Sequence, residues 1–223
     1  GLYKLKNRDT EARFILTTEI SCIYSKNNRV RKVHLILFAP SLEAVEKINT
    51  QLAWVGNLKA DGRPIIGIDS KEVVKICLSA SPDCMVVPAH AWTPWFSVFG
   101  SKSGFDSLEE CFDEYTKYIY AIETGLSSDA AMNWRLSKLD NIALISNSDS
   151  HSLAKIGREA NVFDTEVSYF AIADAIKTKD PTKFLFTVEF FPEEGKYHYD
   201  GHRLCGVSMA PEESKKHHNI CPK

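Results

Sequence analysis

The stretch IALISNSDSHS at residues 142–152 carries a pair of side chains whose types and spacing suit metal chemistry. Its apolar start, residues 142–145, is typical of a buried strand, and the polar residues that follow include Asp149 and His151. Residues two apart on an extended segment point the same way, so this carboxylate and this imidazole can bind one cation. The C-terminal edge of such a strand is where α/β barrels carry their active sites. An isolated Asp-x-His pair is also common in surface loops, so the hypothesis depends on similar residues elsewhere in the chain.

Acids and imidazoles recur at or just beyond the ends of other apolar runs, with one of them inside a run. They are Glu19, His34, His90 and Glu123, which belong to runs at residues 14–20, 31–38, 84–87 and 118–123. Imidazole nitrogen and carboxylate oxygen together suit Zn, Mn or Fe, and a set of this size can hold more than one ion. Two neighbouring ions can activate water and neutralise the attacking and leaving oxygens of a phosphoester displacement. The sequence therefore predicts phosphoester hydrolysis.

Two of these residues also have simpler explanations. His34 lies between Val33 and Leu35 and can be a hydrogen-bonded core histidine. Glu123 can cap a turn or pair with Arg135. Both residues therefore stay open between a metal role and a structural one.

Aromatic residues follow His90 closely and are accompanied by a lysine. Trp92, Trp95 and Phe96 offer faces on which an extruded base could stack, and Lys102 could contact a phosphate. The same rings could instead close the mouth of the fold, because aromatic side chains bury well wherever they lie. We expect this segment to form a long loop over the same edge as His90.

Helical patterns separate the apolar runs. They lie at residues 42–54, 71–79, 107–115, 128–136 and 168–178, and a last strand is predicted at 184–191. Ser41 is a good N-cap, and Ser107 with Glu110 matches a capping box. Alternating strands and helices are typical of a βα repeat, so the sequence predicts an α/β fold with a mainly parallel sheet. A turn is expected at Asp61-Gly62.

The composition is that of an ordinary globular chain. It has 223 residues, 44% hydrophobic and 25% charged, enough for one large domain or a domain with an appendage. The net charge of -2 gives no overall basic field, so a nucleic acid would have to meet a local basic patch. No run of eighteen apolar residues and no signal-peptide pattern is present, and four cysteines stand singly among apolar neighbours. The sequence therefore predicts a cytoplasmic protein with no membrane partner.

Several motifs together resemble a known superfamily. TTEIS around Glu19, KVHLILF around His34, VVPAHAWTPW around His90 and SNSDSH around Asp149 and His151 resemble successive metal-binding motifs of the polymerase-and-histidinol-phosphatase (PHP) domain. Within that superfamily the closest likeness is to endonuclease Q, a DNA-repair family found mainly in archaea. The segments that carry this likeness are GNLKADGRPIIG, PAHAWTPWFSVFGSKSGFDS and the tail YHYDGHRLCGVSMAPEE. The resemblance runs through nearly the whole chain.

The resemblance implies a fold and an activity. The fold would be a distorted TIM-like (β/α)7 PHP barrel that lacks its first strand, over residues 1–191, followed at 192–223 by the start of a small zinc-binding module. The activity would be hydrolysis of the phosphodiester 5′ to a deaminated base (hypoxanthine, uracil or xanthine) or an abasic site in DNA. The implied partners are such DNA and other replication or repair proteins.

The resemblance also implies roles for individual residues. The metal ligands would be Glu19, His34, His90, Asp149 and His151, holding two or more divalent ions (Zn, Mn or Mg). Glu19, Asp149 and His151 would be catalytic, and loss of Asp149 would abolish cleavage. Trp92, Trp95, Phe96 and Lys102 remain the expected substrate contacts.

Two departures from the family pattern stand out. PHP domains open with a His-x-His motif on the first strand, and none precedes Phe14, so two expected ligands are missing. Cys205 and Cys221 match part of a four-cysteine zinc module whose remaining pair would fall at or beyond residue 223. A substitute site could draw on nearby histidines, which are His198, His202, His217 and His218. The chain starts with Gly1 and both ends look cut, which indicates a fragment of a longer protein.

Two alternatives remain open. The first is a PHP-type phosphoesterase that acts on a small phosphate monoester, which would need a compact pocket and no DNA-binding appendage. The second is a PHP module that has lost its catalytic metals and serves as a binding surface. The zinc-like tail argues against the first, and the joint presence of Glu19, His90, Asp149 and His151 argues against the second.

Overall fold

The computed structural model describes residues 1–60, 62–195 and 197–223. For residues 202 and 203 it describes the backbone but not the side chains. Asp61 of the predicted turn and the side chain of His202 therefore lie outside the described residues. The largest sheet has the strand order β3-β1-β2-β4. Its strands are β1 (Leu16–Lys26), β2 (Arg29–Ala39), β3 (Ile65–Ile66) and β4 (Met85–Pro88).

A two-residue turn joins β1 to β2. Lys26 pairs with Arg29, and both residues between them have positive φ, +54° at Asn27 and +58° at Asn28. This is the backbone of a type I′ hairpin turn, which Asn tolerates well. β1 and β2 are therefore antiparallel, and β4 also runs antiparallel to β2. The expectation of a mainly parallel sheet is wrong for this part of the chain, because parallel strands need a long crossover and a two-residue loop cannot supply one.

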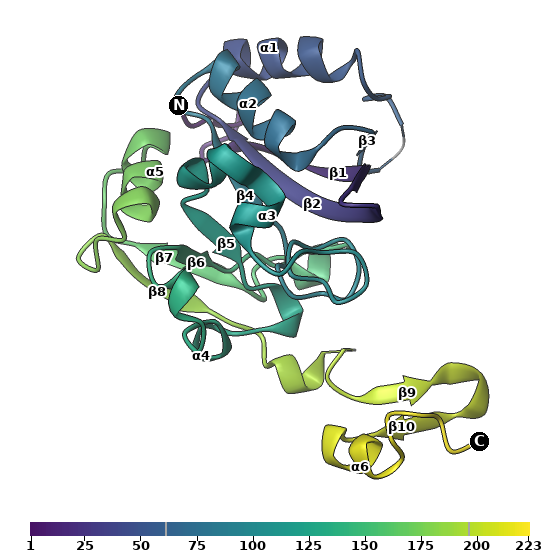
Figure 1. Cartoon of the computed structure of the whole chain (residues 1–223). Helices are drawn as coiled ribbons and strands as arrows, with labels where there is room; N and C mark the ends of the chain where they lie inside the picture. The colour runs from purple at the N-terminus through teal and green to yellow at the C-terminus, as the bar shows by residue number, and fades with distance from the viewer. Residues whose placement is uncertain (61, 196) are drawn as a thin grey trace.

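The two faces of this hairpin have different roles. One face packs its apolar side chains into the main hydrophobic core, which also includes buried residues of α1 (Leu42–Leu52) and α2 (Ser70–Ala80). Figure 1 shows these two helices covering that side of the hairpin. Ser41 caps α1 as predicted, accepting a hydrogen bond from Ala44 N at 3.2 Å. Because side chains alternate along a strand, the other face is left for Glu19, Ser21 and His34.

The remaining strands continue the wall that β4 begins. β5 (Ala121–Glu123) pairs in parallel with β6 (Ala143–Ile145), and β7 (Ala160–Phe163) pairs antiparallel with β8 (Phe184–Val188). Hydrogen bonds link these pieces, among them those from Ala91 N to Glu123 O at 2.9 Å and from Ser146 Oγ to Val188 O at 2.9 Å. The mixed α/β class is confirmed. The described strands nevertheless form four separate sheets and do not close into a barrel.

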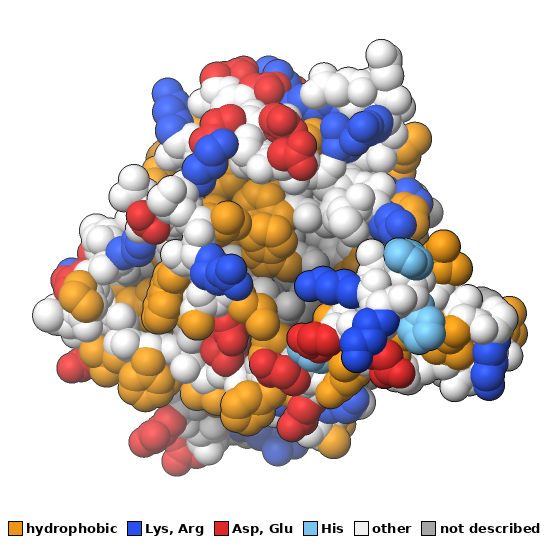
Figure 2. Space-filling model, turned by 60° about the horizontal axis from the view of Figure 1, so that its bottom comes forward, with side chains coloured by type: hydrophobic (Ala, Val, Ile, Leu, Met, Phe, Trp, Pro, Cys, Tyr) orange, Lys and Arg blue, Asp and Glu red, His pale blue; other side chains and the backbone are white. Residues whose placement is uncertain are grey.

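Among the described residues, three further α-helices belong to the main body, and two of them are short. They are α3 (Leu108–Phe112), α4 (Ala130–Asn133) and α5 (Tyr169–Thr178). None of the helices in the described part of the chain is both long and apolar enough to span a membrane. Acidic, basic and apolar side chains are interspersed over the face shown in Figure 2, as the small net charge of -2 suggests.

The C-terminal residues form a small unit beside the main body. It contains β9 (Asp200–His202), antiparallel to β10 (Val207–Met209), and α6 (Pro211–Lys216). Figure 1 shows this unit set off from the rest of the chain and joined to it by the segment after β8. The boundary predicted between residues 191 and 192 stays a prediction.

Candidate metal centre

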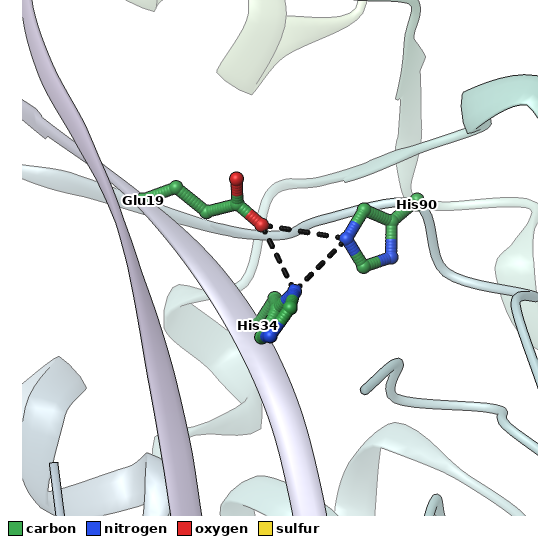
Figure 3. A group of neighbouring side chains, drawn as sticks. All are labelled: Glu19, His34 and His90. Carbon is green, nitrogen blue, oxygen red and sulfur yellow. Dashed lines mark hydrogen bonds and ion pairs between the residues drawn. The ribbon is translucent and has the colours of Figure 1, made fainter. Parts of the chain in front are cut away.

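Three elements bring Glu19, His34 and His90 together. The pairing of Ser21 with His34 makes Glu19 and His34 diagonal neighbours on one face of the hairpin. His90 stands just beyond β4, where Ala89 N donates to His34 O at 3.0 Å and so prolongs the β2–β4 ladder. Figure 3 shows the three side chains pointing toward a common centre.

Their donor atoms are spaced as ligands of one ion would be. Glu19 Oε1 lies 3.0 Å from His34 Nδ1 and 3.3 Å from His90 Nε2, and the two nitrogens are 3.1 Å apart. Ligands bound tetrahedrally to zinc at about 2.0–2.1 Å are separated by about 3.3 Å. Glu19 Oε1 is buried, yet it accepts no well-aligned hydrogen bond from the described residues. These observations fit a divalent cation held by all three atoms.

A hydrogen bond holds one imidazole in position, and ring stacking holds the other. His90 Nδ1 lies 3.1 Å from Thr93 Oγ1, which fixes the ring so that Nε2 faces Glu19. The ring of Phe96 stacks on His34 with centroids 4.8 Å apart. Both rings are therefore oriented without any ion.

Arg63 helps to keep the Glu19 carboxylate ionised. Its guanidinium donates to Glu19 Oε2 at 2.8 Å. Burial alone would raise the pKa of Glu19, but the adjacent imidazoles of His34 and His90 and the Arg63 guanidinium outweigh it and hold that pKa far below its usual range. Burial lowers the pKa of His34, whereas the carboxylates around His90 overcome burial and raise its pKa. The trio thus offers an ionised oxygen and at least one neutral imidazole to a metal.

Asp149 and His151 lie apart from the trio. They follow β6 in a loop, and their side chains are 31% and 79% exposed. His151 Nδ1 is 3.0 Å from Asp149 O and 3.9 Å from Asp149 Oδ1. Among the described residues only Glu19, His34 and His90 gather closely enough to share an ion. The five predicted ligands are therefore divided into a closely spaced trio and a separate pair.

One cavity connects the trio with the pair. It has a volume of about 520 Å³, and His34, His90, Asp149 and His151 all line it. Its other lining residues include three cations and four aromatic rings, which are Arg63, Lys155, Arg158, Trp95, Phe96, Phe190 and Tyr197. Arg158 also holds the loop, donating to Ser148 O at 2.8 Å. Three positive side chains and four aromatic rings therefore line the cavity beside the candidate metal centre, together with the carboxylates of Asp149 and Glu194.

Two predicted substrate contacts lie elsewhere. Trp92 donates to Asn133 Oδ1 at 2.8 Å and packs on Phe99, and it lines a different cavity of about 310 Å³. Lys102 is exposed and does not line the cavity of the trio. The sequence interpretation missed Arg63 and Arg158. Arg63 stands in a segment rich in turn signals, and nothing in its sequence neighbourhood marks it as a partner of Glu19.

Glu123 lies behind His90. It is 3% exposed, and its two oxygens accept hydrogen bonds from His90 N at 2.7 Å and from Asn147 Nδ2 at 2.9 Å. Burial raises the pKa of Glu123 to about 7, although these two donors act in the opposite direction. Both oxygens are thus engaged with N–H groups of residues next to the metal centre.

Comparison with known proteins identifies relatives. No protein-family profile matches the chain. It is 32% identical over 178 residues to an uncharacterized protein of Bacillus subtilis, YqxK, covering 78% of this chain and 44% of that protein. It is 31% identical over 142 residues to an uncharacterized protein of Methanocaldococcus jannaschii, covering 60% of this chain and 17% of that one.

A solved structure gives the decisive comparison. The crystal structure of the lesion-specific endonuclease PfuEndoQ from Pyrococcus furiosus matches with a TM-score of 0.78 and 27% identity over 100% of this chain. The chain is similar to endonuclease Q. The similarity to endonuclease Q includes the C-terminal unit and confirms the resemblance that the sequence predicts. The chain spans 52% of that endonuclease and less than half of either curated relative.

The C-terminal unit of this endonuclease Q-like chain brings two thiols together. Burial and the adjacent Cys221 thiol raise the pKa of Cys205, and both cysteines are half-buried. Within the described ranges no third His, Cys, Asp or Glu completes a metal-binding group with them. Two thiols can supply half of a four-cysteine zinc site. The zinc module therefore stays a prediction.

Proposed function

We propose that this chain belongs to a DNA-repair endonuclease that hydrolyses the phosphodiester 5′ to a deaminated base or an abasic site. The observation that carries the proposal is the Glu19, His34 and His90 trio, which opens into a cavity lined by cations and aromatic rings. The similarity to a lesion-specific endonuclease supports a nuclease. Hypoxanthine, uracil and xanthine are the proposed target bases.

Each group around the cavity has a proposed task. Glu19, His34 and His90 would hold a divalent ion, and Asp149 and His151 would be further ligands at the cavity edge. Bound ions would supply water activation and neutralise charge on the phosphate. Arg63, Lys155 and Arg158 would position phosphates through charge-assisted hydrogen bonds. Trp95 and Phe96 would stack against the extruded base.

Several finer features belong to the same proposal. The ions would be Zn, Mn or Mg, with two or more in the complete centre, and a structural zinc would bind Cys205 and Cys221 in the full-length protein. The wall formed by β4, β5 and β6 would be part of a distorted barrel. The protein would work in the cytoplasm, alongside other replication or repair proteins.

A phosphoesterase for small monoesters is the second candidate. The cavity volume of about 520 Å³ lies within the usual range of small-molecule sites, and its three cations could bind one phosphate. This observation favours a small substrate as far as size is concerned. The four aromatic rings have no evident role in such a reaction, so we prefer the nuclease.

Strand cleavage tests the proposal directly. End-labelled duplexes that contain hypoxanthine, uracil or no lesion are incubated with the full-length protein and Mg²⁺ or Mn²⁺. We expect a nick 5′ to the lesion that is lost with chelator and in Asp149→Asn. Asp164→Asn, an exposed aspartate after β7, is the matched control and should cleave normally. Intact lesion duplexes together with hydrolysis of p-nitrophenyl phosphate would instead establish the monoesterase.

A further inference from the structure

Glu123 joins two segments that are far apart in the sequence. Its Oε2 accepts the main-chain N–H of His90 at 2.7 Å, and its Oε1 accepts Asn147 Nδ2 at 2.9 Å. Asn147 lies two residues before Asp149, in the loop that leaves β6. The carboxylate therefore connects the backbone of one member of the trio with the loop that carries the separate pair of candidate ligands.

Asn161 and Ser146 fix the orientation of the Asn147 side-chain amide. Asn161 Oδ1 accepts Ser146 N at 2.8 Å, and Asn161 Nδ2 donates to Ser146 O at 2.8 Å. Asn161 therefore cannot be rotated by half a turn without placing two donors and two acceptors face to face. Its Nδ2 also donates to Asn147 Oδ1 at 3.1 Å, so the amide nitrogen of Asn147 must point toward Glu123.

His90 N and Asn147 Nδ2 both donate to residue 123. Both terminal atoms of its side chain must therefore be hydrogen-bond acceptors. Glutamine at this position would keep the acceptor for His90 N but would present an NH₂ group to the NH₂ group of Asn147. Two donors that face each other in a buried place destabilise the arrangement, because neither can be satisfied. A carboxylate satisfies both contacts at once.

The backbone of His90 needs such support. Its φ is +30°, which is unusual for a residue with a side chain. Glu123 holds this backbone at two points. Its side chain accepts a hydrogen bond from His90 N, and its main-chain O accepts one from Ala91 N at 2.9 Å. Gly125 also packs closely, since a Cβ added there would lie 2.7 Å from His90 Cβ. The end of β5 thus fixes where the His90 ring stands.

We infer that Glu123 is a positioning residue that ties His90 to the loop carrying Asp149 and so sets the geometry of the metal centre. It acts through its two N–H donors and does not itself bind the ion. The inference rests on the proposed function in one respect, which is that the trio binds a divalent metal.

A reversal of hydrogen-bond polarity tests this role. Three variants of the full-length protein are compared: Glu123→Gln, Asn147→Asp and the double variant. In Glu123→Gln two amide NH₂ groups would face each other, and in Asn147→Asp two carboxylates would do so. Each single variant should therefore weaken Mn²⁺ binding by about tenfold or more. In the double variant glutamine donates to aspartate, and the aspartate accepts from Asn161. We therefore expect its Mn²⁺ affinity to return to within about threefold of the wild-type value.

Mn²⁺ binding is measured by titration with electron paramagnetic resonance as the readout. Stability is measured by thermal unfolding without metal. A double variant that folds but binds Mn²⁺ no better than Glu123→Gln overturns the inference, and this is the result expected if Glu123 were a ligand. Wild-type affinity in Glu123→Gln, with only a lower Tm, overturns it too, since Glu123 would then support the fold alone. A wild-type protein that binds no Mn²⁺ overturns it together with the metal centre.

Parallel nicking assays separate this inference from the proposed function. Rescue of Mn²⁺ binding in a protein that cleaves no lesion duplex supports the role of Glu123 and refutes the nuclease. Cleavage by the wild-type protein without rescue in the double variant supports the nuclease and refutes the role of Glu123.

Discussion

Glu19 has two oxygens with different partners, and this decides the charge of the metal centre. Oε1 faces the two imidazoles, whereas Oε2 is paired with Arg63 at 2.8 Å. The carboxylate and the guanidinium cancel, so the trio with neutral imidazoles carries no net charge once Arg63 is counted with it. A divalent ion would therefore make the floor of the cavity positive. That charge would attract a phosphate group.

Glu159 is a second buried carboxylate, and it makes stability depend on pH. It is 3% exposed, and burial raises its pKa to about 7, with the Phe190 N–H opposing this and Glu189 adding to it. Because this folded-state pKa lies above the ordinary value of 4.5, the folded protein holds the proton more tightly than the unfolded chain does. Its contribution to stability is complete below pH 4.5 and is lost as the pH rises through 7.

We predict that Glu159→Gln stabilises the protein at pH 8 by up to about 3 kcal/mol and changes little at pH 5, because the amide needs no proton to stay neutral. Urea unfolding at the two pH values gives the free energies. Glu166→Gln, at an exposed glutamate, should have the same small effect at both. An equal gain at pH 5 and pH 8 would show that the proton on Glu159 is irrelevant.

The sequence indicates which residues are candidate metal ligands, but it does not indicate how close together they lie. Glu19, His34 and His90 stand out because acids and imidazoles follow or interrupt apolar runs. Their convergence depends on the register of β1 on β2, which no local pattern specifies. Arg63 contacts Glu19 across 44 positions of sequence, so only the folded chain reveals it.

At the scale of elements, the sequence indicates where the strands lie better than whether neighbouring strands are parallel or antiparallel. The run at 142–145 becomes β6 and the run at 31–38 lies within β2. The sequence pattern predicts mainly parallel strands, whereas β1 and β2 are antiparallel, because Asn27-Asn28 is a weaker hairpin signal than Asn-Gly. β7 was not predicted at all, since its sequence ANVF is short and only partly apolar. The α/β class survives these errors because the helices between the strands were placed correctly.

Gly125, just beyond β5, allows a test of how closely that strand end fits against His90. Its φ is +62°, and an added Cβ would meet His90 Cβ at 2.7 Å and His90 Cα at 2.8 Å. We predict that Gly125→Ala displaces His90 and lowers Mn²⁺ affinity by about tenfold or more. Calorimetric titration of the full-length protein with Mn²⁺ measures this.

Gly206 provides the matched control for that substitution. Its φ of +64° imposes a similar backbone strain, about 1–2 kcal/mol for a residue with a side chain, but nothing lies within 4 Å of an added Cβ. Gly206→Ala should therefore bind Mn²⁺ like the wild type. If both variants keep full affinity, the packing of Gly125 against His90 has no role in holding the ring.

At the scale of the whole molecule, the charge is mixed and the net charge is -2, so overall attraction to DNA is absent. The cations that line the cavity must therefore supply the contacts to phosphate. We predict that Lys155→Ala weakens DNA binding and lowers the slope of log affinity against log salt by about one. Fluorescence anisotropy with a labelled duplex at several KCl concentrations measures the slope.

Lys47→Ala, at an exposed lysine on α1, is the control for this prediction. It removes the same charge on the opposite side of the hairpin from the metal centre and should leave the slope unchanged. Equal slopes for all three proteins would place the phosphate backbone away from the cavity. The cations around the trio would then need another explanation.

The hairpin that carries Glu19 and His34 can also discriminate between alternative pairings of its strands. Side chains alternate along β1 and β2, so a slip of either strand by one residue would exchange its faces. A slipped β1 would turn Glu19 into the core that includes α1 and α2 and bring Ile20 to the cavity side. A slipped β2 would do the same with His34 and Val33. An unpaired carboxylate in that core would cost far more than the apolar surface could regain. The polar residues that would bind the metal thus also exclude misfolded hairpins, and the chemistry and the folding of this chain constrain the same two positions.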